Sequence, residues 1–256
     1  VNGVTVGKGA NSVSTNTALG VNALDDSVTG GNNTAIGNNT LTANTSGNSN
    51  VAVGSNALDA NTTASSLTAV GYGALGSNTT GAQNVALGAN ALDAVTTSGN
   101  NVAIGYDALT NNTAANNTAV GNRCMDTNTT GSDNVAIGQL ALEANTTGSY
   151  NVAVGSGALD ANTTASENTA LGYGALGVNT TGSNNVAVGS GALDANTTAS
   201  NNTALGTSAL TSNTTGEKNT AVGVEALQNN TTASNNTAFG RRAGKANTTG
   251  TTLTAI

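Results

Sequence analysis

The chain has 256 residues, of which only 7% are charged and 2% aromatic, and Gly, Asn, Thr and Ala are its most abundant residues. A typical globular domain has about 25% charged residues, so this chain has to gain stability from many small contacts and regular backbone hydrogen bonds. Its net charge of −7 comes without a basic cluster, which argues against nucleic-acid binding because that requires Lys and Arg to displace counterions. No apolar run approaches the roughly 20 residues that cross a bilayer, and we expect no membrane insertion.

The first residues contain a degenerate copy of a pattern that recurs along the whole chain. Gly3-Val4-Thr5-Val6-Gly7 precedes the first regular copy, and residues 1–15 are therefore predicted to form a degenerate N-terminal coil. The single cysteine, Cys124, excludes an intrachain disulfide.

From residue 16 to residue 252 a unit of 17 residues is repeated 14 times. A glycine closes its first five residues at Gly20, Gly37, Gly54, Gly71, Gly88, Gly105, Gly121, Gly138, Gly155, Gly172, Gly189, Gly206, Gly223 and Gly240. One step, from Gly105 to Gly121, has 16 residues. Residues 253–256 start a further copy, from which we expect the chain to be a segment of a longer protein.

The consensus reads N-[TV]-A-[VIL]-G-x-x-A-L-x-x-N-T-T-[GA]-x-x, and its positions are numbered 1 to 17, so that Asn151 occupies position 1 and Asn162 position 12. Positions 2 and 4 carry β-branched residues with the period of a strand. Gly, Asn and Thr are poor helix formers, and turn residues follow position 5 and surround position 14. This pattern predicts an all-β fold, a parallel β-solenoid of 17-residue coils. The Ala-Leu step at positions 8 and 9 fits a second strand or one helical turn, and we favour the strand.

Stacked coils place each residue over its counterpart in the next coil. The invariant Ala at position 3 then indicates a place with no room for a larger side chain. We expect the Val, Ile and Leu residues of position 4 and the Leu residues of position 9 to fill the narrow interior. Gly at position 5 fits a sharp corner with positive φ or close backbone approach. Asn and Thr at fixed positions predict side-chain hydrogen-bond ladders between coils.

Departures from the consensus fit the same interpretation. Cys124 and Met125 stand at the Ala and Leu positions of their coil, so we interpret Cys124 as a packed core residue rather than a reactive thiol. Gly244 replaces Leu in the last complete coil, which empties a core position there.

The residue types predict no catalytic, metal or cofactor site, and we expect neither an enzyme nor a bound cofactor. The chain has no His, which removes nucleophile–His pairs and His metal ligands. Carboxylates at position 10 come from separate coils and are interpreted as a solvated face rather than a catalytic pair: Asp59, Asp93, Glu143, Asp160 and Asp194.

The Asn-Thr-Thr triplets around position 12 are formally N-glycosylation sequons. They recur at Asn61, Asn78, Asn128, Asn145, Asn162, Asn179, Asn196, Asn213, Asn230 and Asn247. Their regular period favours a corner with a side-chain ladder instead. Rows of Thr also raise the possibility of ice binding, but adjacent residues such as Thr163 and Thr164 point to opposite sides of a strand.

Tyr72, Tyr106 and Tyr173 share position 6, directly after the corner glycine. An exposed Tyr at a corner is suited to contact with a carbohydrate or protein receptor, or to covering the edge of a neighbouring chain, and we favour the second use. These three residues are the candidate surface contacts that the sequence offers.

With these motifs laid out, the chain resembles two related groups. The N-[TV]-A-[VIL]-G segment is similar to the head repeats of trimeric autotransporter adhesins, the YadA-like left-handed β-rolls. The whole unit, and nearly the whole chain, is similar to the N-T-A-[VI]-G-x-x-A-L-x-x-N-T-T-G arrays of phage tail-fibre proteins.

The resemblance implies a left-handed coil, a homotrimeric fibre and a place on a virion or cell surface. It implies contact with host cell-surface carbohydrate or protein. A phage tail fibre is the leading expectation, a bacterial surface adhesin or self-assembling extracellular filament is the alternative, and an ice-binding solenoid is the third. The physics of the repeat also favours an oligomer, because coils with so thin an interior bury more apolar area per residue when three chains share a core.

Overall fold

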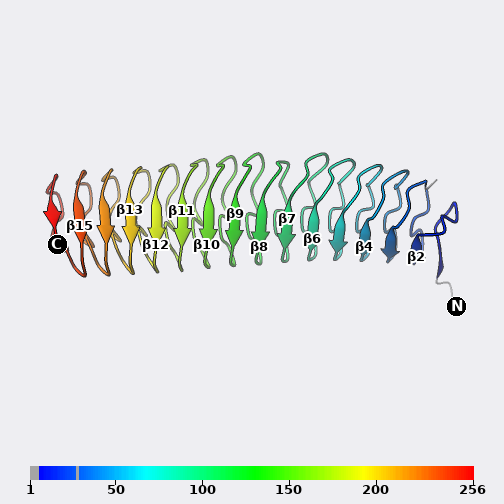
Figure 1. The fold of residues 1–256 in the computed structure, drawn as a ribbon, viewed down its shortest axis with the longest axis horizontal. Helices are drawn as coiled ribbons and strands as arrows, with labels where there is room; N and C mark the ends of the chain where they lie inside the picture. The colour runs from blue at the N-terminus through cyan, green and yellow to red at the C-terminus, as the bar shows by residue number, and fades with distance from the viewer. Residues whose placement is uncertain (1–5, 27–28) are drawn as a thin grey trace. The chain divides into compact units, whose positions relative to one another are not determined.

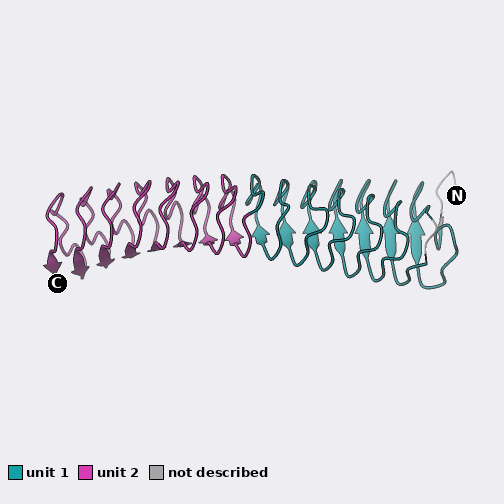
Figure 2. Cartoon of the chain, turned by 90° about the horizontal axis from the view of Figure 1, so that it is seen from above, with its two compact units in different colours: residues 1–130 teal, residues 131–256 magenta. Residues whose placement is uncertain are grey.

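The computed structural model describes residues 6–26 and 29–256, and the chain divides into two compact units (Figure 2), unit 1 (Val1–Thr130) and unit 2 (Gly131–Ile256). The strands of unit 1 are β1 (Val6–Gly7), β2 (Thr17–Leu19), β3 (Thr34–Ile36), β4 (Val51–Val53), β5 (Thr68–Val70), β6 (Val85–Leu87), β7 (Val102–Ile104) and β8 (Thr118–Val120). Those of unit 2 are β9 (Val135–Ile137), β10 (Val152–Val154), β11 (Thr169–Leu171), β12 (Val186–Val188), β13 (Thr203–Leu205), β14 (Thr220–Val222), β15 (Thr237–Phe239) and β16 (Thr254–Ala255).

Both units are parallel β-solenoids with one strand in each coil (Figure 1). From β2 onward in unit 1, and throughout unit 2, consecutive strands pair in parallel. The register places each repeat position on the same position of the next coil, so that Ala153 pairs with Ala170 and Val152 with Thr169. No helix occurs in the part of the chain that the structure describes. The predicted all-β solenoid of 17-residue coils is therefore confirmed.

The N-terminal strand β1 departs from this pattern because it runs antiparallel to β2, with Val6 opposite Leu19. The backbone N–H of Ala10 also donates to the carbonyl of Leu24 (2.9 Å). Gly3, Val4 and Thr5 of the degenerate copy lie outside the described residues. The antiparallel strand pairs one edge of the unit 1 sheet, which would otherwise present unpaired backbone groups.

The Ala-Leu step at positions 8 and 9 forms a turn, so the prediction of a second strand was wrong. Leu at position 9 has a positive φ, between +47° and +54°, a conformation that costs about 1 kcal/mol per residue for an L-amino acid. The Leu N–H still bonds to the next coil, as from Leu159 to the carbonyl of Ala175 (3.0 Å). The left-handed conformation directs the Leu side chain inward, and full burial of a Leu stabilises the fold by about 2–3 kcal/mol, which offsets the strain.

The interior is lined by Ala at position 3 and Leu at position 9, not by the residues of position 4. Ala153 and Leu159 are fully buried, whereas Val152 and Val154 on either side of Ala153 lie on the outer surface. The same pattern recurs along both units, so the expectation that the Val, Ile and Leu residues of position 4 fill the interior was wrong. Successive strand residues point to opposite faces, and a coil this narrow accepts only the Ala face.

Two ladders of buried Asn side chains complete the interior. At position 12 each side chain donates to its counterpart in the preceding coil, as from Asn162 Nδ2 to Asn145 Oδ1 (2.8 Å), and to its own corner, here the carbonyl of Ala165 (3.1 Å). At position 1 the Oδ1 atom of Asn151 accepts the backbone N–H of Asn168 (3.0 Å). These bonds satisfy amides that would each cost free energy if buried without partners. The predicted Asn ladders are confirmed.

One break in the position 12 ladder leaves a buried acceptor without a donor. Asn78 Nδ2 donates to Asn61 Oδ1 (3.2 Å), but Val95 occupies the next coil and offers no donor. Asn78 Oδ1 is buried and has no hydrogen-bond partner. An orphaned buried acceptor costs about 1–3 kcal/mol, so this coil is a local weakness of unit 1.

The 16-residue step is absorbed at the corner after position 12. Asn112 donates through Nδ2 to the carbonyl of Ala114, two residues on, where other coils bridge three residues. Its Oδ1 atom still accepts from Asn128 (2.7 Å), and the strands on either side of the deletion keep their register. The shortened corner therefore leaves the ladder and the sheet intact.

The corner glycine at position 5 has φ between +128° and +148° in every coil. A Cβ atom on Gly155 would overlap the backbone carbonyl of Gly172 in the next coil. Both reasons predicted for this glycine therefore apply at once, positive φ and close backbone approach.

Completion of the ladder is expected to stabilise unit 1. Val95→Asn supplies the donor that Asn78 Oδ1 lacks and should raise the free energy of unfolding by about 1 kcal/mol. The reverse change in unit 2, Asn162→Val, removes the Nδ2 donor that bonds to Asn145 Oδ1 and should lower the free energy of unfolding by about 2–3 kcal/mol. Denaturant unfolding measures both, and a stabilising effect of Asn162→Val would contradict the role of the ladder.

Two neighbouring glycines of one corner are expected to differ sharply. At Gly157 (φ +65°) an added Cβ meets no atom within 4 Å, so Gly157→Ala should cost only the left-handed backbone penalty of about 1 kcal/mol. Gly155→Ala adds an overlap with the next coil and should cost about 3 kcal/mol or more. Thermal unfolding of the two variants checks this order, and equal losses would exclude close coil approach as the reason for Gly155.

Candidate functional site on the corner face

Positions 6, 7 and 10 of successive coils form one surface, which we call the corner face. Tyr72 and Tyr106 in unit 1 and Tyr173 in unit 2 lie on it at position 6, with exposed fractions of 60%, 53% and 72%. The predicted surface contacts are thus exposed in their own chain. The fourth tyrosine, Tyr150, is also exposed but stands at position 17 of its coil.

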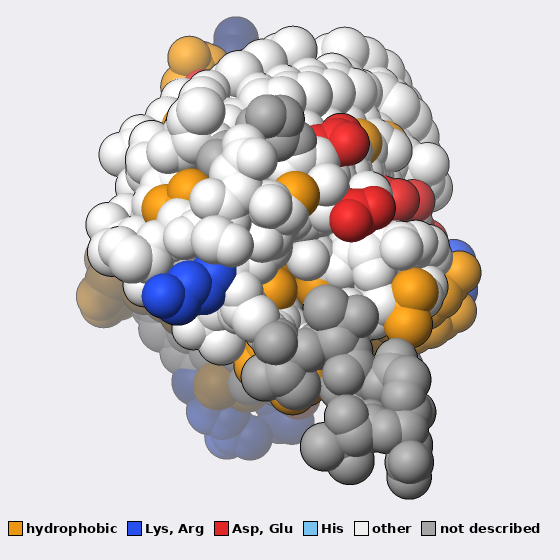
Figure 3. Space-filling model, turned by 90° about the vertical axis from the view of Figure 1, so that its right-hand side faces the viewer, with side chains coloured by type: hydrophobic (Ala, Val, Ile, Leu, Met, Phe, Trp, Pro, Cys, Tyr) orange, Lys and Arg blue, Asp and Glu red, His pale blue; other side chains and the backbone are white. Residues whose placement is uncertain are grey.

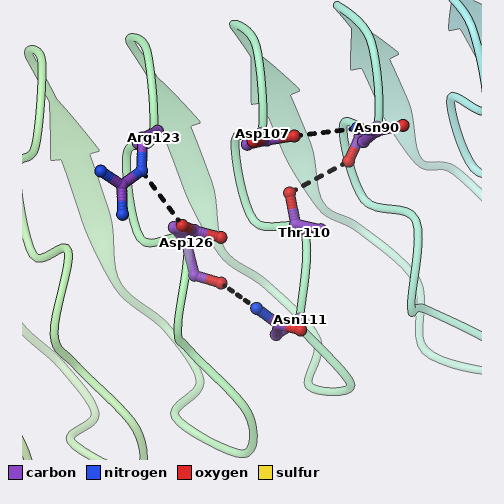
Figure 4. Close-up of polar contacts among 6 residues, drawn as sticks. All are labelled: Asn90, Asp107, Thr110, Asn111, Arg123 and Asp126. Atoms are coloured by element: carbon purple, nitrogen blue, oxygen red, sulfur yellow. Dashed lines mark hydrogen bonds and ion pairs between the residues drawn. The ribbon is translucent and has the colours of Figure 1, made fainter.

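In the coil of Tyr106 and the coils next to it, side chains of the corner face bond to one another (Figure 4). Asn90 Nδ2 donates to Asp107 Oδ1 (3.0 Å), and Arg123 pairs with Asp126 (3.4 Å). A hydrogen bond with the Asp107 carboxylate raises the pKa of Tyr106 above its ordinary value. The polar groups around this tyrosine are therefore already engaged within unit 1.

Side chains of the face near the end of unit 2 are bonded in a similar way. Lys245 and Arg242 both donate to Glu225, at 2.6 Å and 2.7 Å. These two bonds, that of Lys245 first, lower the pKa of Glu225 to about 2. The pairs link successive coils.

Beside Tyr72, by contrast, the corner face is hollow. The coil of Tyr72 has glycine at both of the following face positions, Gly73 and Gly76, so its neighbours in the adjacent coils border a groove of about 470 Å³. We call this the Tyr72 groove. Its polar walls are Asn56, Asp59, Ser77, Asn90 and Asp93.

Unit 2 contains a second groove of the same construction, the Tyr173 groove, of about 420 Å³. Gly174 and Gly177 again leave the two positions after the tyrosine empty, and Asp160 and Asp194 again border them. It differs at its rim, where Leu140 and Val178 contribute apolar surface. The sequence places these four glycines at positions 7 and 10, away from the corner glycine of position 5. It does not show that their missing side chains leave a groove.

The carboxylates of position 10 are only partly in solvent. Burial raises the pKa of Asp59, Asp93 and Asp160, and the charge of Asp59 raises that of Asp93 further. A Cβ on Gly76 would lie 2.7 Å from Asp93 Oδ1 and 3.6 Å from Asp59 Oδ1, so both carboxylates face the empty position. Figure 3 looks onto the N-terminal end of unit 1, and the larger groups of Asp and Glu side chains visible there, in red, lie on one side. Among the described residues no group of three or more His, Cys, Asp or Glu is placed to hold a metal ion.

The sequon asparagines of position 12 are buried and bonded. Asn162 and its counterparts from Asn61 to Asn230 have no exposed surface, and Asn247 at the end of unit 2 is half-buried. Their Nδ2 atoms, which a glycan would modify, donate within the ladder. The structure therefore agrees with the interpretation of these triplets as corners.

The two Thr residues that follow have different surroundings. Thr163 Oγ1 donates to the carbonyl of Thr180 in the next coil (3.2 Å), whereas Thr164 is exposed. The structure places these residues in a bend rather than in the strand from which the prediction argued, and other coils expose both members of the pair, as at Thr96 and Thr97.

Cys124 is fully buried next to Met125, in agreement with its interpretation as a core residue. Burial raises the pKa of its thiol to about 12.

No helix in the described part of the chain has the length and apolarity needed to cross a membrane. No protein-family model, curated protein or solved structure matched the chain.

The Cys124 thiol is expected to react only after unfolding. With a pKa of about 12, roughly one thiol in ten thousand is ionised at pH 8, and the thiolate is the reactive form. Alkylation by iodoacetamide should therefore be at least 100-fold slower in buffer than in 6 M guanidinium chloride. Mass spectrometry of intact protein measures the rate, and rapid labelling of folded protein would show that the coil opens at this position.

Proposed function

We propose that this chain is a structural fibre protein, part of a phage tail fibre that projects toward a host cell surface, and that it assembles as a homotrimer without catalytic activity. The observation that carries the proposal is the apolar outer face of the sheet, formed by positions 2 and 4 of each coil. The resemblance of the repeat to tail-fibre arrays supplies the biological setting. The same features support the alternative of a bacterial surface adhesin.

The apolar outer face runs along both units. In unit 1 it includes Val51 and Leu87, which are 38% and 44% exposed. In unit 2 the exposed members include Val135, Ile137, Val152, Leu171, Val186, Leu205 and Phe239. Soluble monomers rarely expose a contiguous apolar surface of this kind, and such surfaces mark sites of association.

A second copy of the chain is the occupant that fits this face best. The apolar side chains repeat at the spacing between stacked strands, about 4.8 Å, and another copy presents a row with the same spacing. Position 2 is Val or Thr and position 4 is Val, Ile, Leu or Phe throughout both units, so the face carries no charge that would repel a copy. Three copies with their faces inward give a closed C₃ arrangement that buries the face in all three chains.

A trimer also remedies the thin interior of the single chain. One coil buries little more than two Ala and one Leu apart from its Asn ladders, so the apolar stabilisation per residue is small. Burial of the outer face adds roughly 25 cal/mol for each Å² removed from water. This gain repeats with every coil, which suits a protein that has to stay folded as an exposed fibre.

Charged substitutions on the outer face are expected to dissociate the assembly. In solution the unaltered chain should have three times the 24.5 kDa mass of one chain, measured by light scattering. Leu171→Glu with Leu205→Glu should shift the mass to that of one chain, because carboxylates buried in a shared core are strongly unfavourable. Thr164→Glu with Thr181→Glu, on an exposed row outside this face, is the matched control and should remain trimeric. A stable folded monomer of the unaltered chain would refute the trimer.

A further inference from the structure

We infer that the Tyr72 and Tyr173 grooves are two equivalent saccharide-binding sites, each of which holds one sugar ring against its tyrosine with hydroxyl groups bonded to the flanking aspartates. The inference deepens the proposed function and rests on it, since a fibre that contacts a host surface needs a recognition site. It concerns the corner face, whereas assembly uses the outer face of positions 2 and 4.

The construction of the groove occurs once in each unit. In each unit a coil with Tyr, Gly and Gly at positions 6, 7 and 10 lies between two coils with Asp at position 10. Beside Tyr106 the face positions carry larger side chains, and Asp107, Arg123 and Asp126 form bonds with one another or with neighbouring side chains. Tyr106 is thus an exposed tyrosine followed by Asp107 and Thr110 at positions 7 and 10 instead of two glycines, and it serves as an internal comparison.

The glycine at position 7 interrupts a ladder of amides and leaves two hydrogen-bonding groups facing the Tyr72 groove. Asn22, Asn39 and Asn56 follow one another at this position, with Asn39 Nδ2 donating to Asn56 Oδ1 (3.2 Å). Gly73 then offers no acceptor, so Asn56 Nδ2 has no hydrogen bond to any described residue. On the other side of the gap Asn90 Oδ1 receives no donor, and it lies 3.3 Å from the place of a Cβ on Gly73.

These groups match the chemistry of a sugar ring. A pyranose has an apolar C–H face that packs on an aromatic ring, and the exposed Tyr72 ring offers such a surface. Its hydroxyl groups both donate and accept. The carboxylates of Asp59 and Asp93 accept only, Asn56 Nδ2 donates and Asn90 Oδ1 accepts. A concave site with a few convergent polar groups is the usual form of a small-ligand site.

The Tyr173 groove shares the tyrosine and both carboxylates but has glycines at position 7 on either side of Gly174, namely Gly157 and Gly191. Leu140 and Val178 line it instead of the two asparagines. The two grooves should therefore accept the same ring face and differ in the substituents at its rim, with more apolar substituents preferred in unit 2.

Binding is tested on the 256-residue chain with three uncharged probes, methyl β-D-glucopyranoside, N-acetyl-D-glucosamine and L-rhamnose. Saturation-transfer NMR detects contact of the C–H face, and tyrosine fluorescence gives the affinity, which is measurable because the chain has no Trp. We expect saturable binding of at least one probe at millimolar concentration, the range of a ligand with about a dozen heavy atoms.

The decisive variant fills both grooves with residues that another coil of the chain carries at the same positions. Gly73→Asn with Gly76→Thr, and Gly174→Asn with Gly177→Thr, copy position 7 of Asn39 and position 10 of Thr42. A Cβ atom at these positions would meet the ends of Asp and Asn side chains and, at Gly76 and Gly177, carbonyl oxygens more than 3 Å away. Binding should fall at least tenfold, while the midpoint of thermal unfolding stays equal or rises.

Tyr72→Ala with Tyr173→Ala should abolish binding independently of the filling variant. Tyr106→Ala is the matched control that should leave the affinity unchanged.

Four outcomes would overturn the inference: no probe binds, the filled protein binds as well as the unaltered protein, Tyr106→Ala alone abolishes binding, or ethanolamine competes and affinity falls with salt. The last outcome would make the grooves sites for organic cations, because attraction to paired carboxylates is screened by salt whereas hydrogen bonding to a neutral sugar is not.

Light scattering on the same samples distinguishes failure of the groove inference from failure of the proposed trimer. A trimer without sugar binding refutes only the grooves, and a sugar-binding monomer refutes only the trimer.

Discussion

Hydrogen bonding between identical positions of successive coils is the constraint on which the rest of this structure depends. Because each coil lies in register on the next, every residue has its own counterpart as its closest neighbour along the stack. A residue is acceptable only if it tolerates a copy of itself about 4.8 Å away. Glycine at the corner, alanine in the strand and asparagine in the two ladders all satisfy this condition. Charged residues tolerate a copy of themselves poorly. In unit 1 a coil with neutral Thr or Gly at position 10 separates each coil with Asp there from the next one, so that no two Asp residues are direct neighbours at this position.

The interior that results is small and half polar, so its stability comes from complete hydrogen bonding rather than from a large apolar core. Asn145 and Asn162 show the principle, since each is buried only because the next coil supplies its partner. Asn78 and Val95 show the cost of an interruption. Leu at position 9 accepts a left-handed conformation in coil after coil, in a turn that places the one large apolar side chain inside.

The outer surface follows from the same limits. A coil that accepts only Ala on the inner side of its strand places Val, Ile and Leu on the outer side, which leaves an apolar face suited to another copy. The corner face is the region where the repeat tolerates variety, and its two hollows arise from glycine substitutions at Gly73, Gly76, Gly174 and Gly177. The proposed assembly and the proposed recognition use different faces of one coil, so that residues of the corner face can vary while the outer face is kept.

The sequence by itself determined the period, the parallel stacking, the corner glycines, the asparagine ladders and the burial of Cys124, because each follows from a residue type repeated every 17 positions. It did not determine which face of the strand points inward. Ala153 and its neighbours Val152 and Val154 alternate equally well in either phase, and only the width of the closed coil decides between them. Nor did it reveal that Leu159 stands in a turn, since a left-handed leucine runs against local preference and is held there by tertiary packing. The grooves also required the structure. Whether a glycine empties a surface or merely turns a corner depends on the side chains that the adjacent coils, 17 residues away, place around it.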